Sequence, residues 1–188
     1  MSEMSKVISQ ILRDIKVELS DEFDRNFERQ GFFSERWKRS RRSTAGGGAT
    51  LIDTGKLRRS ITSRSDATSI TFYTTEPYAA IHNEGGEIKV TAKMKRFFWA
   101  KYYEASGSFG RRKDGSLRQD KRNARLSDAA SMWQYMALMK VGSTIKMPKR
   151  RFLGASVEVE RAVRDIVEEN IAEYVGNELI IKIQEDLK

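Results

Sequence analysis

The sequence predicts an α+β fold in which a small, mostly antiparallel sheet packs against long N-terminal and C-terminal helices. Apolar residues recur at helical spacing up to residue 30 and again from about residue 156. Between these stretches, β-branched and apolar residues alternate with polar ones over residues 57–63, 69–75 and 86–91, as in half-buried strands. A chain of 188 residues is long enough to bury a core, and we expect residues 1–188 to form one domain.

The first expected element is a long helix within residues 1–30. Its apolar stripe consists of Ile8, Ile11, Leu12, Ile15, Leu19, Phe23 and Phe27. At 1.5 Å per residue this helix would reach about 40 Å, which is long for so small a domain, and Gly31 is a natural end. We therefore expect the helix to project or to pack on a neighbouring protein.

Two basic, glycine-containing segments predict flexible loops, one at residues 36–50 and one inserted at residues 106–127. Their basic side chains are candidates for contact with phosphates or with an acidic partner, and the alternative is that they are simply solvated. These candidates are Arg36, Lys38, Arg39, Arg41 and Arg42 in the first segment and Arg111, Arg112 and Lys113 in the second.

The first two predicted strands form a hairpin around a polar turn at residues 65–68, and Pro77 follows the second strand because it cannot donate to a ladder. The aromatic segment 94–105 fits either a short helix or a strand covered on both faces. A helix is predicted over residues 128–140, where Asp128 is a good N-cap.

The final predicted helix starts near Ser156 and is expected to break or kink at Gly176-Asn177. The last residues, 179–187, then fit a further helical piece, although their apolar run also fits a strand.

The charge is unevenly distributed along the chain. The whole sequence carries a formal charge of +9, but residues 158–188 contain nine acids and four bases, a net −5, which leaves +14 for the rest. A basic body with an acidic end is suited to nucleic acid, or to head-to-tail packing of identical copies. No cysteine and only one histidine are present, which argues against a structural zinc site, and no apolar run approaches membrane-spanning length.

Three short stretches resemble pieces of enzyme signatures. His82 lies two residues before Glu84 and could act as a general base, but a nucleophile and an oxyanion donor are not indicated, so a structural role is favoured. GGGATLIDTGK lacks the glycine and the hydroxyl residue of a phosphate-binding loop. LIDTG is similar to the aspartic-protease triplet, yet Lys56 does not suit a carboxylate pair, and we interpret residues 53–55 as a turn.

Taken together, LIDTGKLRRSI (51–61), YAAIHNEGG (78–86) and MPKRRFLGAS (147–156) resemble the virion morphogenesis or tail-completion family of tailed bacteriophages and prophages. The matching stretches occur there in the same order. Asn83 stands where glutamine is frequent, and Arg151 stands where proline is frequent. The residues assigned to the motifs are Asp53, Thr54, Gly55, Leu57, Tyr78, Ile81, His82, Gly85, Gly86, Pro148, Phe152, Leu153 and Gly154.

The resemblance implies a structural virion protein without catalysis, cofactor or metal, assembled in the host cytoplasm as a ring at the neck or tail end. Its partners would be further copies of itself and neighbouring head, neck or tail proteins, and not a membrane. Contact of the basic loops with DNA is the alternative function. Within the motifs, we expect Tyr78 and Ile81 to face the core, His82 and Asn83 to bond to backbone or a neighbouring chain, and Gly85-Gly86 to turn the chain.

Overall fold

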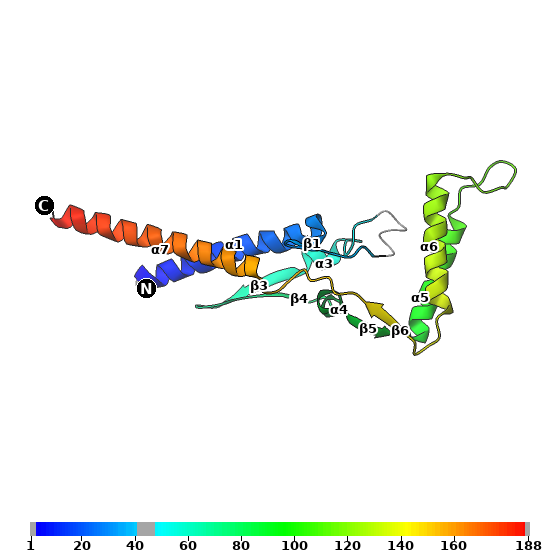
Figure 1. Ribbon diagram of the computed structural model, residues 1–188, viewed down its shortest axis with the longest axis horizontal. Coiled ribbons are helices and arrows are strands. Elements are labelled where there is room, and N and C mark those ends of the chain that lie inside the picture. Colours follow the sequence, from blue (N-terminus) through cyan, green and yellow to red (C-terminus); the bar gives the residue numbers. More distant parts are fainter. Residues whose placement is uncertain (1–2, 41–47, 187–188) are drawn as a thin grey trace.

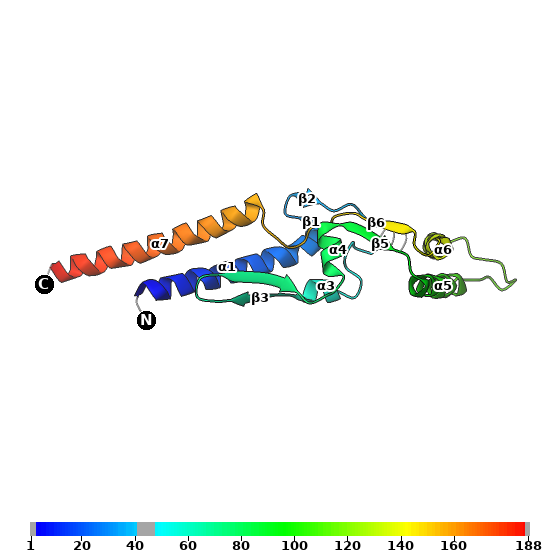
Figure 2. The same ribbon diagram turned by 90° about the horizontal axis from the view of Figure 1, so that it is seen from below.

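The computed structural model describes residues 3–40 and 48–186 and confirms the α+β class. The protein is elongated: two long helices project at one end, strands and short helices lie in the middle, and a separate pair of helices stands at the other end (Figure 1). A view turned by 90° shows the same order along the long axis (Figure 2). Within the described ranges, none of the helices has the length and apolar character needed to cross a membrane.

Helix α1 (Glu3–Arg29) confirms the predicted N-terminal helix, and α7 (Val157–Asp186) forms the C-terminal one. The two run in opposite directions, so the two chain ends lie at the same end of the molecule (Figure 1). Helix α7 continues through Gly176, so the expected break there is wrong, and residues 179–186 are helical rather than extended. A single glycine inside a helix costs only about 1 kcal/mol relative to alanine, which is too little to end a 30-residue helix.

The contact between α1 and α7 forms one of two apolar clusters. Its buried residues are Ile15, Leu19, Phe23 and Phe32, and Val159, Val163 and Ile166 of α7 pack against them. Phe32 belongs to a short antiparallel hairpin that the sequence pattern did not indicate, formed by β1 (Gly31–Phe32) and β2 (Glu35–Arg36). This hairpin reverses the chain immediately after α1.

The predicted hairpin of the first two strands is present as β3 (Ile61–Ser65) and β4 (Ile70–Thr74), paired antiparallel. Its start was predicted too early, because residues 56–59 form a helical turn, α3 (Lys56–Arg59), and not a strand. The turn buries Leu57 in the core, and Arg58 then reaches α1 and pairs with Asp24 and Glu28. The bond to Arg58 lowers the pKa of the Asp24 carboxyl.

The third predicted strand is present as β5 (Gly86–Lys89), but it does not join the β3–β4 hairpin. It pairs antiparallel with β6 (Thr144–Met147), a strand that was not predicted, with Gly86 opposite Met147. The described residues therefore form three two-stranded sheets rather than one. The reason is topological: α4 (Ala79–Glu84) separates β4 from β5 and redirects the chain toward β6.

Two helices, α5 (Ala92–Gly107) and α6 (Lys121–Leu138), form an arm that stands off the body (Figure 1). Segment 94–105 is thus helical. The buried apolar residues are Phe98 and Ala105 in α5 and Ala130 and Ala137 in α6. Helix α6 begins seven residues before the predicted Asp128, because Asp120 is the N-cap and its carboxylate accepts a bond from the Asn123 amide at 2.8 Å. The predicted insertion 106–127 is therefore divided between both helices and the loop that joins them.

Candidate functional site at the junction of three motifs

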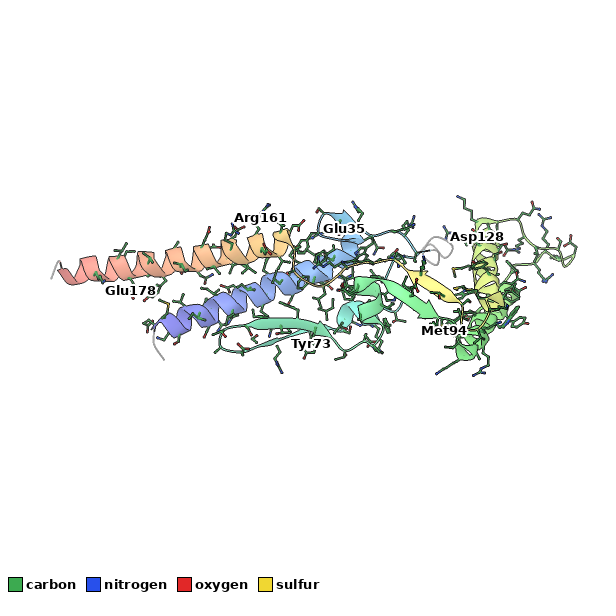
Figure 3. All side chains as sticks on the ribbon, turned by 60° about the horizontal axis from the view of Figure 1, so that its bottom comes forward. Glu35, Tyr73, Met94, Asp128, Arg161 and Glu178 are labelled. Carbon is green, nitrogen blue, oxygen red and sulfur yellow. The ribbon has the colours of Figure 1, made fainter. Side chains whose placement is uncertain are left out.

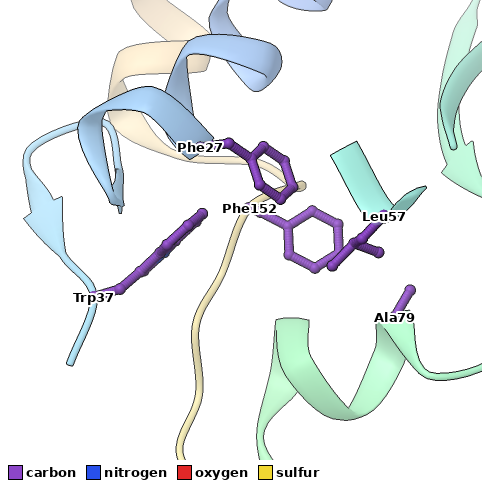
Figure 4. Packing of buried hydrophobic residues seen from close by; sticks show 5 residues of the cluster. All are labelled: Phe27, Trp37, Leu57, Ala79 and Phe152. Carbon is purple, nitrogen blue, oxygen red and sulfur yellow. The ribbon is translucent and has the colours of Figure 1, made fainter. Parts of the chain in front are cut away.

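The three sequence motifs converge on one apolar cluster. Leu57, Ala79 and Phe152 come from the first, second and third motif, and all three are buried in the same cluster (Figure 4). Phe27 from α1 and Trp37 from the segment after β2 complete it, with the Phe27 ring centroid 5.5 Å from that of Phe152 and 5.5 Å from that of Trp37. The motifs are thus parts of one structural unit, although 95 positions separate Leu57 from Phe152 in the sequence.

Asn83 joins the second motif to the third through its side-chain amide. Its Oδ1 accepts bonds from the backbone amides of Phe152 at 3.0 Å and Leu153 at 3.1 Å, and its Nδ2 donates to the Leu153 carbonyl at 3.0 Å. The side-chain amide accepts through its oxygen and donates through its nitrogen, and the two backbone donors determine which atom is the oxygen. Asn83 therefore pairs three backbone groups of the third motif.

Arg150 forms a second connection between these segments. Its backbone amide donates to the His82 carbonyl at 2.8 Å, and its Nε donates to the Lys38 carbonyl at 2.8 Å. The Arg150 residue is only 4% exposed, and burial lowers the pKa of its guanidinium. An arginine nevertheless stays charged in proteins. The buried Arg150 guanidinium is therefore a cation that contacts the backbone of the segment carrying Lys38.

His82 bonds to the third motif through its backbone carbonyl, whereas its side chain was expected to form the bond. Its carbonyl accepts the Arg150 bond, but its Nδ1 is buried and has no hydrogen-bond partner in the described part of the chain. Burial, and secondarily the nearby Arg150 charge, lower the pKa of the imidazole, which favours its neutral form. The Glu84 carboxylate contacts other groups: it accepts a bond from the Asn83 amide at 2.6 Å and lies 4.0 Å from the Lys149 ammonium. Of the two side chains expected to bond to backbone, Asn83 therefore does so, whereas the His82 Nδ1 does not within the described residues.

Stability should fall as the solution is acidified through the titration range of His82. The unfolded chain has an imidazole pKa near the ordinary 6.5, and the folded chain has a lower one, so the unfolded state binds the proton first. The free energy of unfolding should therefore decrease as pH drops below about 6.5, until the folded pKa is also passed. Urea unfolding at about pH 7.5 and about pH 5.5 measures this change.

The matched control for this pH effect is His82→Gln, which removes the only histidine of the chain. Carboxylates titrate equally in both proteins, so the difference between their two pH profiles isolates the imidazole. Identical profiles for the wild type and the variant would contradict the assignment.

Gly85 turns the chain at the end of α4 in a conformation that only glycine adopts readily. Its φ is 76° and its ψ is −173°, and a Cβ at this position would lie 2.8 Å from the Lys149 amide nitrogen. The second motif therefore approaches the third motif backbone to backbone. The expectation that Gly85-Gly86 turn the chain into the next strand is met, since Gly86 begins β5 with a φ of 139°.

Gly85→Ala should lower the free energy of unfolding by about 1–3 kcal/mol, because alanine is strained at this φ and its methyl group meets backbone. Gly176→Ala is the matched control: nothing lies within 4 Å of its would-be Cβ, and the residue is inside α7. The control should be neutral or slightly stabilising. Urea unfolding of both variants measures the contrast, and equal effects would contradict the close approach at Gly85.

A cavity of about 540 Å³ opens beside this junction. Asp53, Thr54 and Gly55 line it, as do His82 and Arg150. Gly55 has a left-handed φ of 74° and precedes α3, so the predicted turn is present, although it leads into a helix rather than directly into a strand. Tyr78 also lines the cavity but is 39% exposed, so the expectation that it faces the core is wrong. It precedes α4 and its ring stacks edge-on against His82 instead.

The remaining motif residues take structural positions. Ile81 is half-buried, and its Cδ1 would meet a Cβ added at Gly86. Leu153 packs against both apolar clusters, whereas Gly154 has a φ of 137° and lies beside the Arg151 guanidinium. Pro148 follows β6 and lies in the segment that leads to Phe152.

The basic candidates are not gathered in one patch. Arg36, in β2, and Lys38 and Arg39, which follow it, are exposed, whereas Arg41 and Arg42 lie outside the described residues. Arg111, Arg112 and Lys113 are exposed in the loop at the outer end of the arm (Figure 1). The first group therefore lies on the body of the protein, and the second group lies on the arm.

Several structural residues of the junction were not singled out from the sequence. Trp37 donates from Nε1 to the Arg151 carbonyl at 2.6 Å, and the buried Asn26 accepts from the Phe33 amide at 2.8 Å and donates to the Phe152 carbonyl. A polar residue such as Asn26 within an otherwise apolar helix stripe is a signal that could have identified one of them, since buried amides require partners. Arg150 carried no such signal.

Comparison with known proteins gives one result. A family model described as the phage virion morphogenesis family matches residues 2–172. No curated protein and no solved structure matches the chain significantly. The match covers all three motifs and the arm, and it ends inside α7. Within the described residues, no group of three or more histidine, cysteine, aspartate or glutamate side chains is placed to hold a metal ion.

Proposed function

The chain belongs to the phage virion morphogenesis family, and we propose that it completes the tail or joins head to tail as a non-catalytic component of a ring. The family indicates a structural role in phage assembly. The partners in this proposal are further copies of the chain and the adjoining head, neck or tail proteins.

The observation that carries the proposal is the separation of charge along an elongated protein. Helix α7 contains nine acids and three bases, a net −6, and it projects at one end (Figure 1). The arm, residues 92–138, contains eleven bases and four acids, a net +7, and stands at the opposite end. A subunit with unlike ends is suited to heterologous contacts, which generate closed rings when the rotation between subunits closes.

The junction of the three motifs supports a structural role. Asn83, Arg150 and Trp37 each bond through their side chains to backbone groups of the protein itself, and Asn83 also donates to the Glu84 carboxylate. Groups used in this way hold the body rigid between the projecting helices and the arm. We propose that the motifs maintain the geometry of the subunit rather than bind a substrate.

The test is electron microscopy of particles produced by a phage or prophage from which the gene is deleted. We expect separate heads and tails, or tails with a defective end, and restoration of joined particles when the wild-type gene is supplied. Normal infectious particles without the protein would overturn the proposal.

Nucleic-acid binding remains the second candidate, because Arg111, Arg112 and Lys113 are all exposed at the tip of the arm. Binding through phosphate contacts would weaken steeply as salt increases. A triple substitution of these residues by glutamine would then reduce DNA affinity and its salt dependence, whereas Lys6→Gln on α1 would not. Absence of binding at about 50 mM salt would remove this candidate.

A further inference from the structure

We propose that the outer half of α7 in one copy docks onto the arm of the next copy, through an apolar face on each. The contact rests on the proposed function, because it would link successive subunits of the ring.

The first surface is the outer α7 face, defined as Ile171, Val175, Leu179 and Ile180. These side chains are 47%, 47%, 56% and 55% exposed, in that order. The inner half of α7 buries its apolar stripe on α1, but the outer half extends past the start of α1 (Figure 1). Ile171, Val175 and Leu179 recur every fourth residue, so they lie along one side of the helix. A helix with a continuous and exposed apolar side is suited to a partner's surface.

The second surface is the arm face, defined as Trp99, Tyr102 and Tyr103 on α5. Their ring centroids lie 5.3–5.8 Å apart, and Tyr103 is 65% exposed. The arm's own core uses other residues, because Phe98 packs on Trp133 of α6. Tryptophan and tyrosine are the residues most enriched among the side chains that dominate interface binding energy.

Charge makes the two surfaces complementary. The outer α7 face is flanked by Glu173 and Glu178 on a helix with a net charge of −6, and the arm carries +7. Opposite potentials accelerate encounter and suppress pairing of like surfaces, so two α7 faces or two arms would repel each other. This favours the contact of unlike surfaces over either symmetric contact.

The two surfaces do not meet within one chain. Figure 3 shows Glu178 on the outer part of α7 and Met94 and Asp128 on the arm, at opposite ends of the molecule. A second copy of the chain supplies the missing partner for each surface. The contact is then head to tail, which repeats from subunit to subunit. The family match ends at residue 172, before Val175, Leu179 and Ile180, so the docking helix extends beyond the matched region.

The test uses two purified full-length variants that each lose one surface. The helix variant carries Val175→Gln and Leu179→Gln, and the arm variant carries Trp99→Gln and Tyr103→Gln. Sedimentation should show self-association of the wild type and its loss in each variant alone. Mixed together, the variants retain one intact surface of each kind and should form a 1:1 complex. Val17→Gln, which changes an exposed residue on α1 outside both surfaces, should associate like the wild type.

Cross-linking checks the contact without removing either surface, because the natural chain has no cysteine. Leu179→Cys mixed with Tyr103→Cys should give a disulfide-linked dimer of the two variants under mild oxidation. Self-association that persists in either double variant, or a mixture that stays monomeric, would overturn the proposal. A monomeric wild type would also overturn it. If single-stranded DNA binding by that monomer were lost in the arm variant, the arm face would be assigned to nucleic acid instead. These measurements do not use particles, so their failure is distinct from failure of the deletion test above.

Discussion

Phe152→Ala should lower the free energy of unfolding by about 3–5 kcal/mol, the largest effect expected of any single change discussed for this protein. Phe152 is 1% exposed and lies at the point where all three motifs meet. Its ring packs on Phe27, so truncation removes buried apolar surface and leaves a cavity between α1 and the third motif. Urea unfolding followed by circular dichroism measures the loss.

Phe97→Ala is the matched control, because Phe97 is 52% exposed on the arm. The same chemical change should cost much less there, since much of the ring is already in contact with solvent. Equal destabilisation by the two substitutions would contradict the placement of the core at the motif junction. Because Phe152→Ala weakens the body, it should also reduce the yield of joined particles in the complementation assay.

Asn83→Leu should cost about 2–4 kcal/mol, because it leaves two backbone amides and one carbonyl of the third motif without their partners. The leucine side chain has the same branching and the same number of heavy atoms, so the loss reports mainly the hydrogen bonds. The measurement is again the free energy of unfolding in urea. Loss of these bonds should separate α4 from the Phe152-Leu153 segment.

Asn83→Asp provides an internal comparison. A carboxylate can still accept from the Phe152 and Leu153 amides but cannot donate to the Leu153 carbonyl, so the expected loss is smaller than that of leucine. His82→Gln, at the neighbouring position, should leave these three bonds intact. If leucine and aspartate at position 83 had equal effects, the accepting role of the side chain would be contradicted.

The elements that depend on local pattern were largely predictable. The stripe from Ile8 to Phe27 defines α1 because one helical period repeats over about five turns. Alternation of Ile70, Phe72 and Thr74 defines the covered side of β4. The turn between β3 and β4 was also predictable from the sequence, because Asp66 accepts bonds from the nearby amides of Thr68 and Ser69. Short-range chemistry decides each of these features.

The errors have a common cause in contacts between distant segments. Pairing of β5 with β6 joins Ile88 to Ile145 across the whole arm, and periodicity within either strand carries no information about its partner. Helix α3 replaced a predicted strand because Leu57 is drawn into the core and Arg58 to α1. At the motif junction, the histidine attracted attention by its chemistry, whereas Asn83 is recognisable only beside Phe152 and Leu153.

The sequence by itself determined the α+β class, the long terminal helices, the three motifs with the family they indicate, and the division into a basic body and an acidic end. These features follow from the amino-acid composition, from the spacing of the motif residues and from the period of the apolar residues. Only the tertiary structure decided that the motifs form one junction, that Asn83 rather than the His82 side chain bonds across it, and that the opposite charges stand at opposite ends of the molecule. Each of these depends on which distant segments pack together, and burial and hydrogen bonding select those partners after the local elements have formed.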